Sequence, residues 1–340
     1  MPTKTTVVQR AIPLSSPLEW KQALSGIPHS FFHTWEHSYA MHLTHKLPAF
    51  LYCAEADDVR VVCPFIERPF GEYIDIATPY GFSGFAGNGV LPSLPQLWRE
   101  FATARGYVSV FLNTHPLFWQ AEFSDPADVF ELKELYLLDA RGKVETLLEG
   151  CARARRRELR KWRAQATLHR DRAQLRRFIL VHYRDFYHSR DATAAYNFSS
   201  ETIEFLVEQD NLLLLGAGSE TRLEAVNAFA VTDDCTEGLF HFSRPEGRRH
   251  SAGLMWEALL ETKRRGIPFF NLGGGLARND SLARFKSRFG ALPLPCRAIR
   301  QVLNAERYAA LCDRSGVNRH DHDEYFPRYR TPKRSDAIHV

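Results

Sequence analysis

The stretch SAGLMWEALLETKRRGIPFFNLGGG, residues 251–275, contains a helix, a helix stop and a strand in immediate succession. Apolar residues recur at helical spacing from Leu254 to Leu259, which predicts an amphipathic helix. Gly266 is expected to end it, because glycine readily adopts the left-handed conformation that closes helices. The apolar run that begins at Ile267 then predicts a buried strand, and three consecutive glycines end that strand.

The same succession of elements occurs earlier in the chain. Residues 92–105 predict a helix, Gly106 stops it, and residues 107–115 form an apolar strand. A hairpin and a third strand precede the helix in each case, over 47–79 in the first copy and 211–244 in the second. Because five elements agree in type and order, we predict two similar domains rather than a solenoid of short repeats.

The order of elements within each copy restricts the sheet. Antiparallel strands come first, and the strand–helix–strand connection that follows requires a parallel pair, because parallel strands must be joined by a crossover. Each copy is therefore predicted to be an α/β domain with a mixed sheet. Acyltransferases of the GNAT class have a similar sheet, in which the parallel pair splays and opens a slot for the acyl donor.

The bulk composition is that of a globular protein with room for two cores. Of the 340 residues, 44% are hydrophobic and 25% charged, which excludes disordered and fibrous classes. The net charge is only +4, so a polyanion site has to come from local clustering of basic residues. The six cysteines form no C-x-x-C pair, which predicts buried, reduced thiols. We expect a cytoplasmic protein, because no apolar leader or segment of membrane-spanning length is present.

Several segments match one known family in type and order. They are TPYGFSG (78–84), CARARRRELRKWRA (151–164), RDATAAYNFSSETIEFL (190–206), NLGGG (271–275), SLARFKSRFG (281–290) and YFPRYR (325–330). With these segments the chain resembles the FemABX group of aminoacyl transferases and the FemAB-like tandem-GNAT acyltransferases, from about Phe32 onward.

The resemblance implies both a fold and an activity. It implies two tandem GNAT-like domains, at 1–148 and 149–296, with the C-terminal segment 297–340 folding back to complete the first. Family members use aminoacyl-tRNA as donor and extend peptidoglycan precursors, while relatives build other peptides or are N-acetyltransferases. The long coiled-coil insertion of the larger members is absent from this sequence, so it resembles the compact type.

A basic stretch opens the second domain. From Arg153 to Arg177 only Glu158 and Asp171 oppose a run of arginines and lysines. On a helix, five of these cations share roughly one face: Arg153, Arg156, Arg157, Arg160 and Lys161. Such a face binds phosphates of a donor, whether the acceptor stem of tRNA, a nucleotide-linked precursor or CoA. The alternative is a solvated helix face at a domain junction.

A second donor-binding candidate is the segment Arg249–Leu254, with Arg249 and Ser251 as contacts. It stands where GNAT enzymes place a glycine-rich loop whose backbone N–H groups hold the CoA pyrophosphate. Ala252 replaces the first glycine of that loop. This departure weakens the acetyl-CoA or acyl-CoA alternative, although the loop is still expected to open a helix and accept an anion.

The third candidate combines the glycine-ended strand with a Phe-Lys pair. Gly273, Gly274 and Gly275 permit positive φ and close approach of the backbone to a donor. Phe285 and Lys286 match the Phe-Lys pair of Fem transferases, which implies that the lysine contacts the tRNA end and the reaction centre. We therefore assign a catalytic role to four residues, Lys286, Phe285, Asn271 and His241. His241 is a candidate proton relay, with a hydrogen-bonded core histidine as the alternative.

Acceptor contacts are expected from both halves of the chain. Asp75 and Tyr80 belong to the strand and loop that end in TPYGFSG, and Arg190, Tyr196 and Arg244 follow from the family position and strand alternation. The run Arg319–Glu324 lacks the fixed spacing of a metal site, so no metal is expected.

The sequence therefore predicts aminolysis of aminoacyl-tRNA by an amine acceptor, with the tRNA as co-substrate and no cofactor. Membrane insertion and DNA binding are not expected. Two alternatives stay open: an acetyl-CoA or acyl-CoA N-acyltransferase, and a non-catalytic tandem-GNAT protein that binds RNA.

Overall fold

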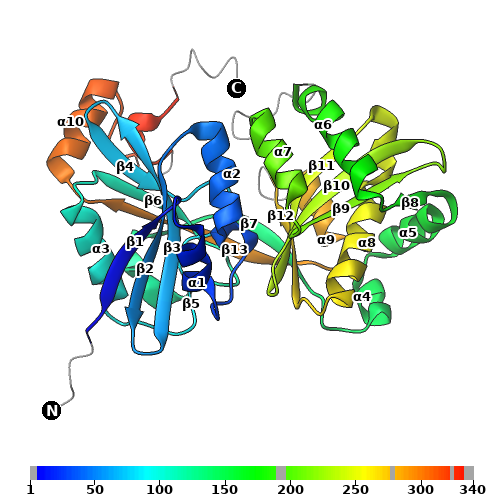
Figure 1. Cartoon of the computed structure of the whole chain (residues 1–340), viewed down its shortest axis with the longest axis horizontal. Coiled ribbons are helices and arrows are strands. Elements are labelled where there is room, and N and C mark those ends of the chain that lie inside the picture. Colours follow the sequence, from blue (N-terminus) through cyan, green and yellow to red (C-terminus); the bar gives the residue numbers. More distant parts are fainter. Residues whose placement is uncertain (1–5, 189–196, 276–279, 322–324, 333–340) are drawn as a thin grey trace. The chain divides into compact units, whose positions relative to one another are not determined.

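The computed structural model describes residues 6–188, 197–275, 280–321 and 325–332 (Figure 1). The chain divides into two compact units, one formed by Met1–Leu132 with Cys296–Val340 and the other by Lys133–Pro295. The sequence predicts the boundary between the domains after residue 148, but in the structure the boundary lies earlier. The reason is that β7 (Val129–Asp139) pairs with β12 (Phe269–Gly274) of the second unit. No helix among these residues is both long and apolar enough to cross a membrane.

The first unit has a mixed sheet with strand order β1-β2-β3-β4-β6-β13. Strands β4 and β6 run parallel, and helix α3 lies in the connection between them. Strand β13 adds the returning C-terminal segment by pairing antiparallel with β6 through Ala298–Val302. The strands are β1 (Val8–Pro13), β2 (Ala49–Ala56), β3 (Val59–Phe70), β4 (Tyr73–Ala77), β6 (Ser109–Asn113) and β13 (Leu292–Val302), and β5 (Ala86–Gly87) pairs with β3.

Helix α3 forms where the spacing of apolar residues predicts a helix. It buries Leu94, Trp98 and Ala102, spaced four apart, which places them on one face. The Trp98 indole packs edge-on against Tyr52 and Phe85 in the core. The helices of the unit are α1 (Pro17–Leu24), α2 (Trp35–His45), α3 (Leu94–Ala104) and α10 (Ala305–Ser315), with single turns η1 (Phe31–His33), η2 (Ala121–Phe123), η3 (Pro126–Asp128) and η6 (Arg328–Arg330).

The second unit repeats this plan with strand order β7-β12-β11-β10-β9-β8. Again one pair is parallel, β11 with β12, and helix α8 connects its members. The strands are β8 (Thr167–His169), β9 (Leu212–Gly218), β10 (Leu223–Val231) and β11 (Cys235–Ser243), besides β7 and β12. The helices are α4 (Val144–Gly150), α5 (Arg153–Gln165), α6 (Arg172–His188), α7 (Ser200–Glu208), η5 (Pro245–His250), α8 (Ser251–Arg264) and α9 (Ser281–Ser287).

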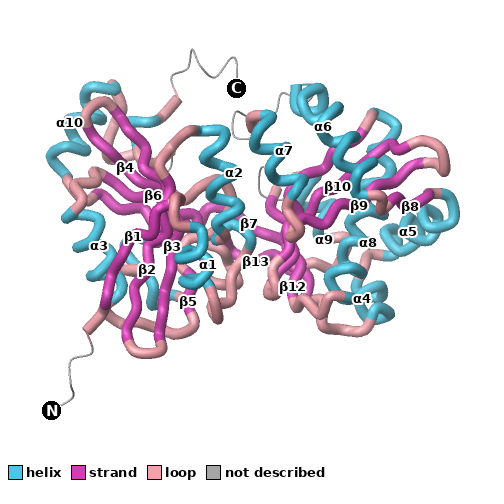
Figure 2. Tube along the Cα trace, in the orientation of Figure 1, coloured by secondary structure: helices cyan, strands magenta, loops and turns pink. Residues whose placement is uncertain are grey.

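Helices cover both faces of the second sheet (Figure 2). Alternate residues of β9 point to opposite faces: Leu215 packs in the core that α5 and α8 share, whereas Gly216 meets Leu175 of α6. The central strands β9 and β10 are buried on both sides, which explains why they read as nearly continuous apolar runs. The order hairpin, third strand, helix, strand is thus present in both units.

Candidate functional site

The parallel strands β11 and β12 separate after three paired positions. Their pairing runs from Cys235 opposite Phe269 to Glu237 opposite Asn271, although β11 continues to Ser243. Just beyond, the register between β10 and β11 shifts, so that Leu239 opposes no residue of β10. A bulge of this kind bends its strand and interrupts the ladder. The two strands therefore diverge where β12 reaches its glycines.

Asn271 holds the turn at the end of β12. Its amide Nδ2 donates to Glu237 Oε2 at 2.8 Å, and its Oδ1 accepts from the Gly273 N–H at 2.8 Å. Both Asn271 and Glu237 are buried, and a buried carboxylate requires such a donor. Asn271 thus links the last paired position to the glycine turn. Glu237 was not predicted, although an acidic residue within an apolar strand is the signal that identifies it.

Gly273 and Gly274 are each required for a different structural reason. Gly273 has φ +76°, a conformation that side chains other than glycine rarely adopt. A Cβ on Gly274 would lie 2.8 Å from the Glu134 carbonyl oxygen, so β7 approaches too closely for any side chain. Gly275 follows β12 directly. The backbone therefore requires glycine at 273 and 274, at the same point where the strands diverge.

Lys286 lies against this turn. Its Nζ donates to the Gly274 carbonyl oxygen at 2.6 Å, and a Cβ on Gly273 would lie 3.2 Å from the same nitrogen. Helix α9 holds the lysine and is capped by Asp280, whose carboxylate accepts from the Ala283 N–H. Burial, followed by the charge of Lys133, lowers the pKa of Lys286 to about 8. The structure thus brings Asn271, Gly273, Gly274 and Lys286 together.

Phe285, the neighbour of Lys286 on α9, contacts Arg155 of α5. The Arg155 guanidinium lies 4.4 Å from the ring centroids of both Phe285 and Phe289, and it donates to the Phe285 carbonyl oxygen at 3.1 Å. It also pairs with Glu158 at 2.7 Å. Arg155 is only 2% exposed, so it fastens α9, and with it Lys286, to α5. Phe285 is placed here as a packing residue rather than at the turn.

The sequence analysis did not predict that Arg155 is buried against α9, because this residue stands within a run of arginines that are mostly at the surface. Its spacing from Leu159 and Trp162 identifies it, because positions i, i+4 and i+7 share one helix face. That face is the buried one of α5. Within the described part of the chain, four cations of the opposite, exposed face have no ion-pair partner: Arg153, Arg157, Arg160 and Lys161. Arg156 differs, because it donates to the carbonyl oxygens of Glu149 and Cys151.

The segment Arg249–Leu254 does open a helix, because α8 begins at Ser251, but the expected donor loop before that helix is itself helical, which is a correction. The turn η5 begins at Pro245 and runs without a break into α8, so α8 has no free N-terminal loop there. The Trp162 indole covers Gly253, where a Cβ would lie 2.1 Å from the ring. Arg249 pairs with Glu224 at 3.0 Å. The glycine-rich anion nest expected from GNAT enzymes is therefore not formed by these residues.

A buried network secures this helix start. Trp162 Nε1 donates to His250 Nδ1 at 2.9 Å, which leaves Nε2 to donate to Glu224 at 3.0 Å. Burial lowers the pKa of His250, against the opposing effect of Glu224. Glu224 and His250 were not predicted. An acidic residue at the start of an apolar strand and a histidine beside an arginine pair are weak signals in the sequence.

His241 is hydrogen-bonded on both ring nitrogens. Its Nδ1 contacts Asn227 Oδ1, and its Nε2 lies 3.1 Å from Ser251 Oγ. Ser251 Oγ also donates to the Arg248 carbonyl oxygen at 2.9 Å. Ser251 and His241 therefore tie α8 to β11, as in the hydrogen-bonded alternative considered for His241.

The acceptor candidates fall in different places. Asp75 is buried in the first unit and is engaged by Arg68 at 2.6 Å, Arg330 at 2.6 Å and the Tyr329 hydroxyl at 2.9 Å. Its carboxylate is thus occupied in fastening the C-terminal segment rather than available to an acceptor. Tyr80 is half-buried in the loop after β4.

The remaining acceptor candidates belong to the second unit. Arg244 contacts two residues of α6. Its Nη2 lies 3.4 Å from His182 Nε2, and its guanidinium packs over the Phe178 ring. Arg190 and Tyr196 lie outside the described residues.

Known structures resemble this chain over both units. No family model and no curated protein matches the sequence. The crystal structure of FemX matches with a TM-score of 0.65 at 12% identity, covering 89% of this chain and 99% of that chain. The structure of L-PGS from Bacillus licheniformis matches with a TM-score of 0.53 at 15% identity, covering 85% of this chain and 92% of that chain.

A third known structure also matches both units of this chain. The C-terminal domain (DUF2156) of a putative lysylphosphatidylglycerol synthetase from Agrobacterium fabrum has a TM-score of 0.52 at 16% identity, and the match covers 88% of this chain and 96% of that domain. The predicted architecture, two tandem α/β domains that each contain a mixed sheet, is confirmed by the structure, and the three matches share this fold. At these identities the likeness concerns the fold.

Proposed function

We propose that this protein is an acyltransferase that moves an aminoacyl group from aminoacyl-tRNA to an amine acceptor. The observation that carries the proposal is the position of Lys286, whose Nζ lies against the Gly274 carbonyl oxygen where β11 and β12 diverge. The shared fold with FemX and the synthetase domains supports this class of reaction. The acceptor is an amine of a peptidoglycan precursor, another small peptide or an amino acid.

The chemistry requires little beyond positioning and charge stabilisation. The acceptor amine attacks the ester carbonyl carbon, a C–N bond forms, and the C–O bond to the tRNA 3′ oxygen breaks. The amine loses a proton, and the departing oxygen gains one. Because an ester is already activated, the protein mainly orients the substrates and stabilises the oxyanion. The Lys286 ammonium and the bulged backbone near Leu239 are suited to that task.

An RNA-borne donor is favoured over CoA by two features of the second unit. The helix start at which GNAT enzymes hold the CoA pyrophosphate is covered by Trp162 and closed by η5. The exposed face of α5, which comprises Arg153, Arg157, Arg160 and Lys161, carries four positive charges along one side of a helix. A helix face of this kind suits a phosphate backbone. The same helix holds α9 through Arg155.

The diverging strands also support the CoA-dependent alternative, because GNAT acyltransferases hold their acyl donor between splayed parallel strands. A non-catalytic RNA-binding protein would use the basic face of α5 alone. Mass spectrometry after incubation with a charged tRNA pool and candidate amines separates the three. An amide product that requires charged tRNA supports the proposal, a product with acetyl-CoA alone supports the first alternative, and RNA binding without any product supports the second.

A further inference from the structure

Four carboxyl groups are buried among the residues that the structure describes: Asp75, Glu224, Glu237 and Glu261. An arginine nitrogen lies within 3.0 Å of Asp75, of Glu224 and of Glu261, and these pairs fasten elements of the fold. Glu237 accepts from the neutral amide of Asn271 at 2.8 Å, at the point where the strands of the proposed reaction site diverge. Because burial of a carboxylate is costly, its position there indicates a role in the site.

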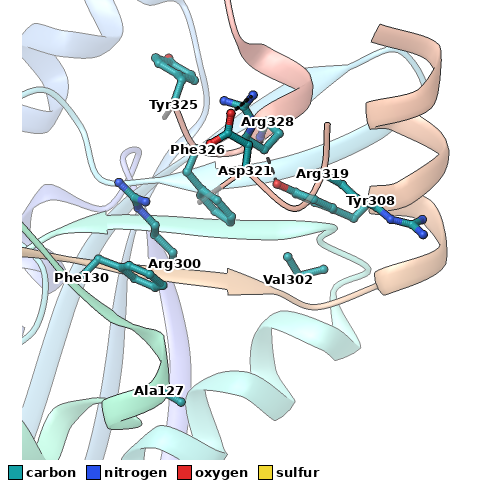
Figure 3. Close-up of a pocket in the computed structure, with 10 residues that line it drawn as sticks. All are labelled: Ala127, Phe130, Arg300, Val302, Tyr308, Arg319, Asp321, Tyr325, Phe326 and Arg328. Atoms are coloured by element: carbon teal, nitrogen blue, oxygen red, sulfur yellow. Dashed lines mark hydrogen bonds and ion pairs between the residues drawn. The ribbon is translucent and has the colours of Figure 1, made fainter. Parts of the chain in front are cut away.

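Charged groups around the cavity of the first unit contribute to the fold. The cavity has a volume of about 120 Å³ and lies beside β13 and α10 (Figure 3). In its wall Asp321 pairs with Arg328 at 3.4 Å. The Arg300 guanidinium lies 4.9 Å from the Phe130 ring centroid and 6.0 Å from that of Phe326. These contacts join β13 to the segment before η6.

Glu237 occupies the last position at which β11 pairs with β12, directly opposite Asn271. Two residues later, Leu239 opposes no residue of β10. The Glu237 side chain thus reaches β12, whereas its backbone leads into the bulge of β11. One residue therefore connects the two strands at the point where they diverge.

Hydrogen-bond chemistry favours one orientation of the Asn271 amide. The Gly273 N–H can only donate, so the amide turns its Oδ1 towards it, at 2.8 Å. The amide nitrogen then faces Glu237, and an ionised carboxylate can only accept. Because both neighbours require the same orientation, Glu237 fixes the side chain that holds the glycine turn.

The glycine turn transmits this constraint to Lys286. The carbonyl oxygen of Gly274, the residue after Gly273, accepts from Lys286 Nζ at 2.6 Å. Loss of the acceptor at Glu237 would let the Asn271 amide rotate and turn its NH₂ group towards the Gly273 N–H. Two donors cannot pair, so the turn would shift and carry the Gly274 carbonyl oxygen away from the ammonium.

We infer that Glu237 is a positioning residue of the proposed transfer reaction, which acts through Asn271 and the glycine turn to hold the Lys286 ammonium where β11 and β12 diverge. The inference rests on the proposed function for the role of Lys286. Besides burial, the charges that act on the pKa of Lys286 are those of Lys133 and Asp280. The effect of Glu237 is therefore expected to come from geometry rather than from its charge.

Competitive labelling of the full chain with acetic anhydride, read by peptide mass spectrometry over a range of pH, follows Lys286 without any transfer reaction. The wild-type midpoint is expected at about pH 8. Glu237→Met removes the acceptor at a similar side-chain length. Water then reaches the ammonium, and the midpoint should move towards about 10.4, the pKa of an exposed lysine. An unchanged or lower midpoint in Glu237→Met would overturn the inference.

If Glu237→Met fails to fold, Asn271→Ser decides, because it breaks the same link from the other end and should raise the Lys286 midpoint in the same way. A wild-type midpoint in a folded Asn271→Ser contradicts the inference.

Two further variants separate positioning from charge and from stability. Glu237→Gln keeps an acceptor oxygen for Asn271 but carries no charge, so it should retain the wild-type midpoint. Glu261→Met removes another buried carboxylate of the second unit, one that pairs with arginines of α8 and its C-cap. It should lower stability and leave the Lys286 midpoint unaltered. A raised midpoint in Glu237→Gln would assign the effect to charge, and one in Glu261→Met would assign it to general destabilisation; either result contradicts the inference.

Single-turnover transfer from charged tRNA measures what the positioning contributes. We expect the rate to fall about tenfold or more in Glu237→Met, because a small misplacement of a reacting group is costly. Glu237→Gln should transfer at close to the wild-type rate. A wild-type rate in Glu237→Met, or a loss in Glu237→Gln as large as that in Glu237→Met, contradicts the inference. If the wild-type protein transfers nothing, the proposed function fails, whereas the labelling still decides whether Glu237 positions Lys286.

Discussion

At the scale of single residues, Lys286 shows how burial sets chemistry. Lys286 belongs to α9 and faces the glycine turn. Its contact with the Gly274 carbonyl oxygen keeps the ammonium at the point where β11 and β12 diverge. Desolvation lowers its pKa to about 8. A desolvated cation is poorly stabilised in the resting protein, and an oxyanion that forms nearby relieves that cost.

Removing the ammonium is expected to slow aminoacyl transfer. For Lys286→Met we expect a fall in the single-turnover rate of about 100-fold, the scale of losing one preorganised oxyanion donor. Lys263→Met, at an exposed end of α8, is the matched control and should transfer at the wild-type rate. An unchanged rate in Lys286→Met would show that the lysine has no part in the reaction.

The pH dependence of transfer tests the protonation state of Lys286. If the ammonium is the active form, the rate falls as pH rises through about 8, because the lysine then loses its proton. The Lys286→Arg variant keeps a guanidinium at this position that stays charged, so its rate should stay level over the same range. A matching decline in both proteins would assign the titration to another group.

The same lowered pKa has a consequence for folding. Between pH 8 and the ordinary pKa of lysine the unfolded chain binds more protons at this residue than the folded one, so stability contributed here rises with pH in that window. Lys286→Met has no such group. The difference in unfolding free energy between wild type and this variant should therefore shift in favour of wild type from about pH 8 to about pH 10, as measured by urea denaturation at each pH. A constant difference would contradict the lowered pKa.

At the scale of elements, α5 serves two purposes with its two faces. The buried face holds α9 through Arg155 and covers the start of α8 through Trp162. The exposed face presents Arg153, Arg157, Arg160 and Lys161. One helix thus positions Lys286 and presents the cations that we propose bind the donor, because side chains three and four positions apart share a face.

Loss of the buried arginine is expected to destabilise the second unit. Arg155→Met removes a charged hydrogen bond to Phe285 and the packing of the guanidinium on two rings, so we expect about 2–3 kcal/mol less unfolding free energy. Arg153→Met, on the exposed face, should change it by less than about 0.5 kcal/mol. Urea denaturation of the two variants measures the contrast, and equal stabilities would contradict the anchoring role.

Neutralising the exposed face is expected to weaken RNA binding. We expect tRNA affinity to fall when four residues are replaced together by glutamine: Arg153, Arg157, Arg160 and Lys161. The slope of log affinity against log salt concentration should become shallower by about 0.7–0.9 for each phosphate that is no longer neutralised. Arg163→Gln is the control on the same helix, because Arg163 already pairs with Glu257. Affinities measured at several salt concentrations decide the matter, and an unaltered slope would exclude this face as the RNA site.

At the scale of the whole molecule, the C-terminal segment completes the first unit. Strand β13 pairs with β6, and Tyr329 and Arg330 reach the buried carboxylate of Asp75 on β4. Residues of the C-terminal segment thus share a core with residues near β4 and β6. The polar contacts around Asp75 fix this return because a buried carboxylate without its partners is costly.

Asp75→Asn is accordingly expected to lower the stability of the first unit by about 3–5 kcal/mol, the usual cost of breaking a buried ion pair. Asp313→Asn, exposed on α10, makes the same change at the surface and should have little effect. Thermal denaturation of both variants provides the measurement. A midpoint for Asp75→Asn equal to that of wild type would show that the segment is held by its apolar contacts alone.

The periodicity of the sequence was sufficient to predict the order of the elements, the duplicated mixed sheet and the strand that ends in glycines. These features depend on the spacing of apolar residues and on helix-stopping glycines, which are local properties of the sequence. Resemblance to a known family also associated Lys286 with that strand. Tertiary structure alone decided that Arg155 is buried, that η5 closes the expected donor loop and that Asp75 binds the C-terminal segment. Each of these depends on partners far apart in the sequence, whose burial and ion pairing no local pattern contains.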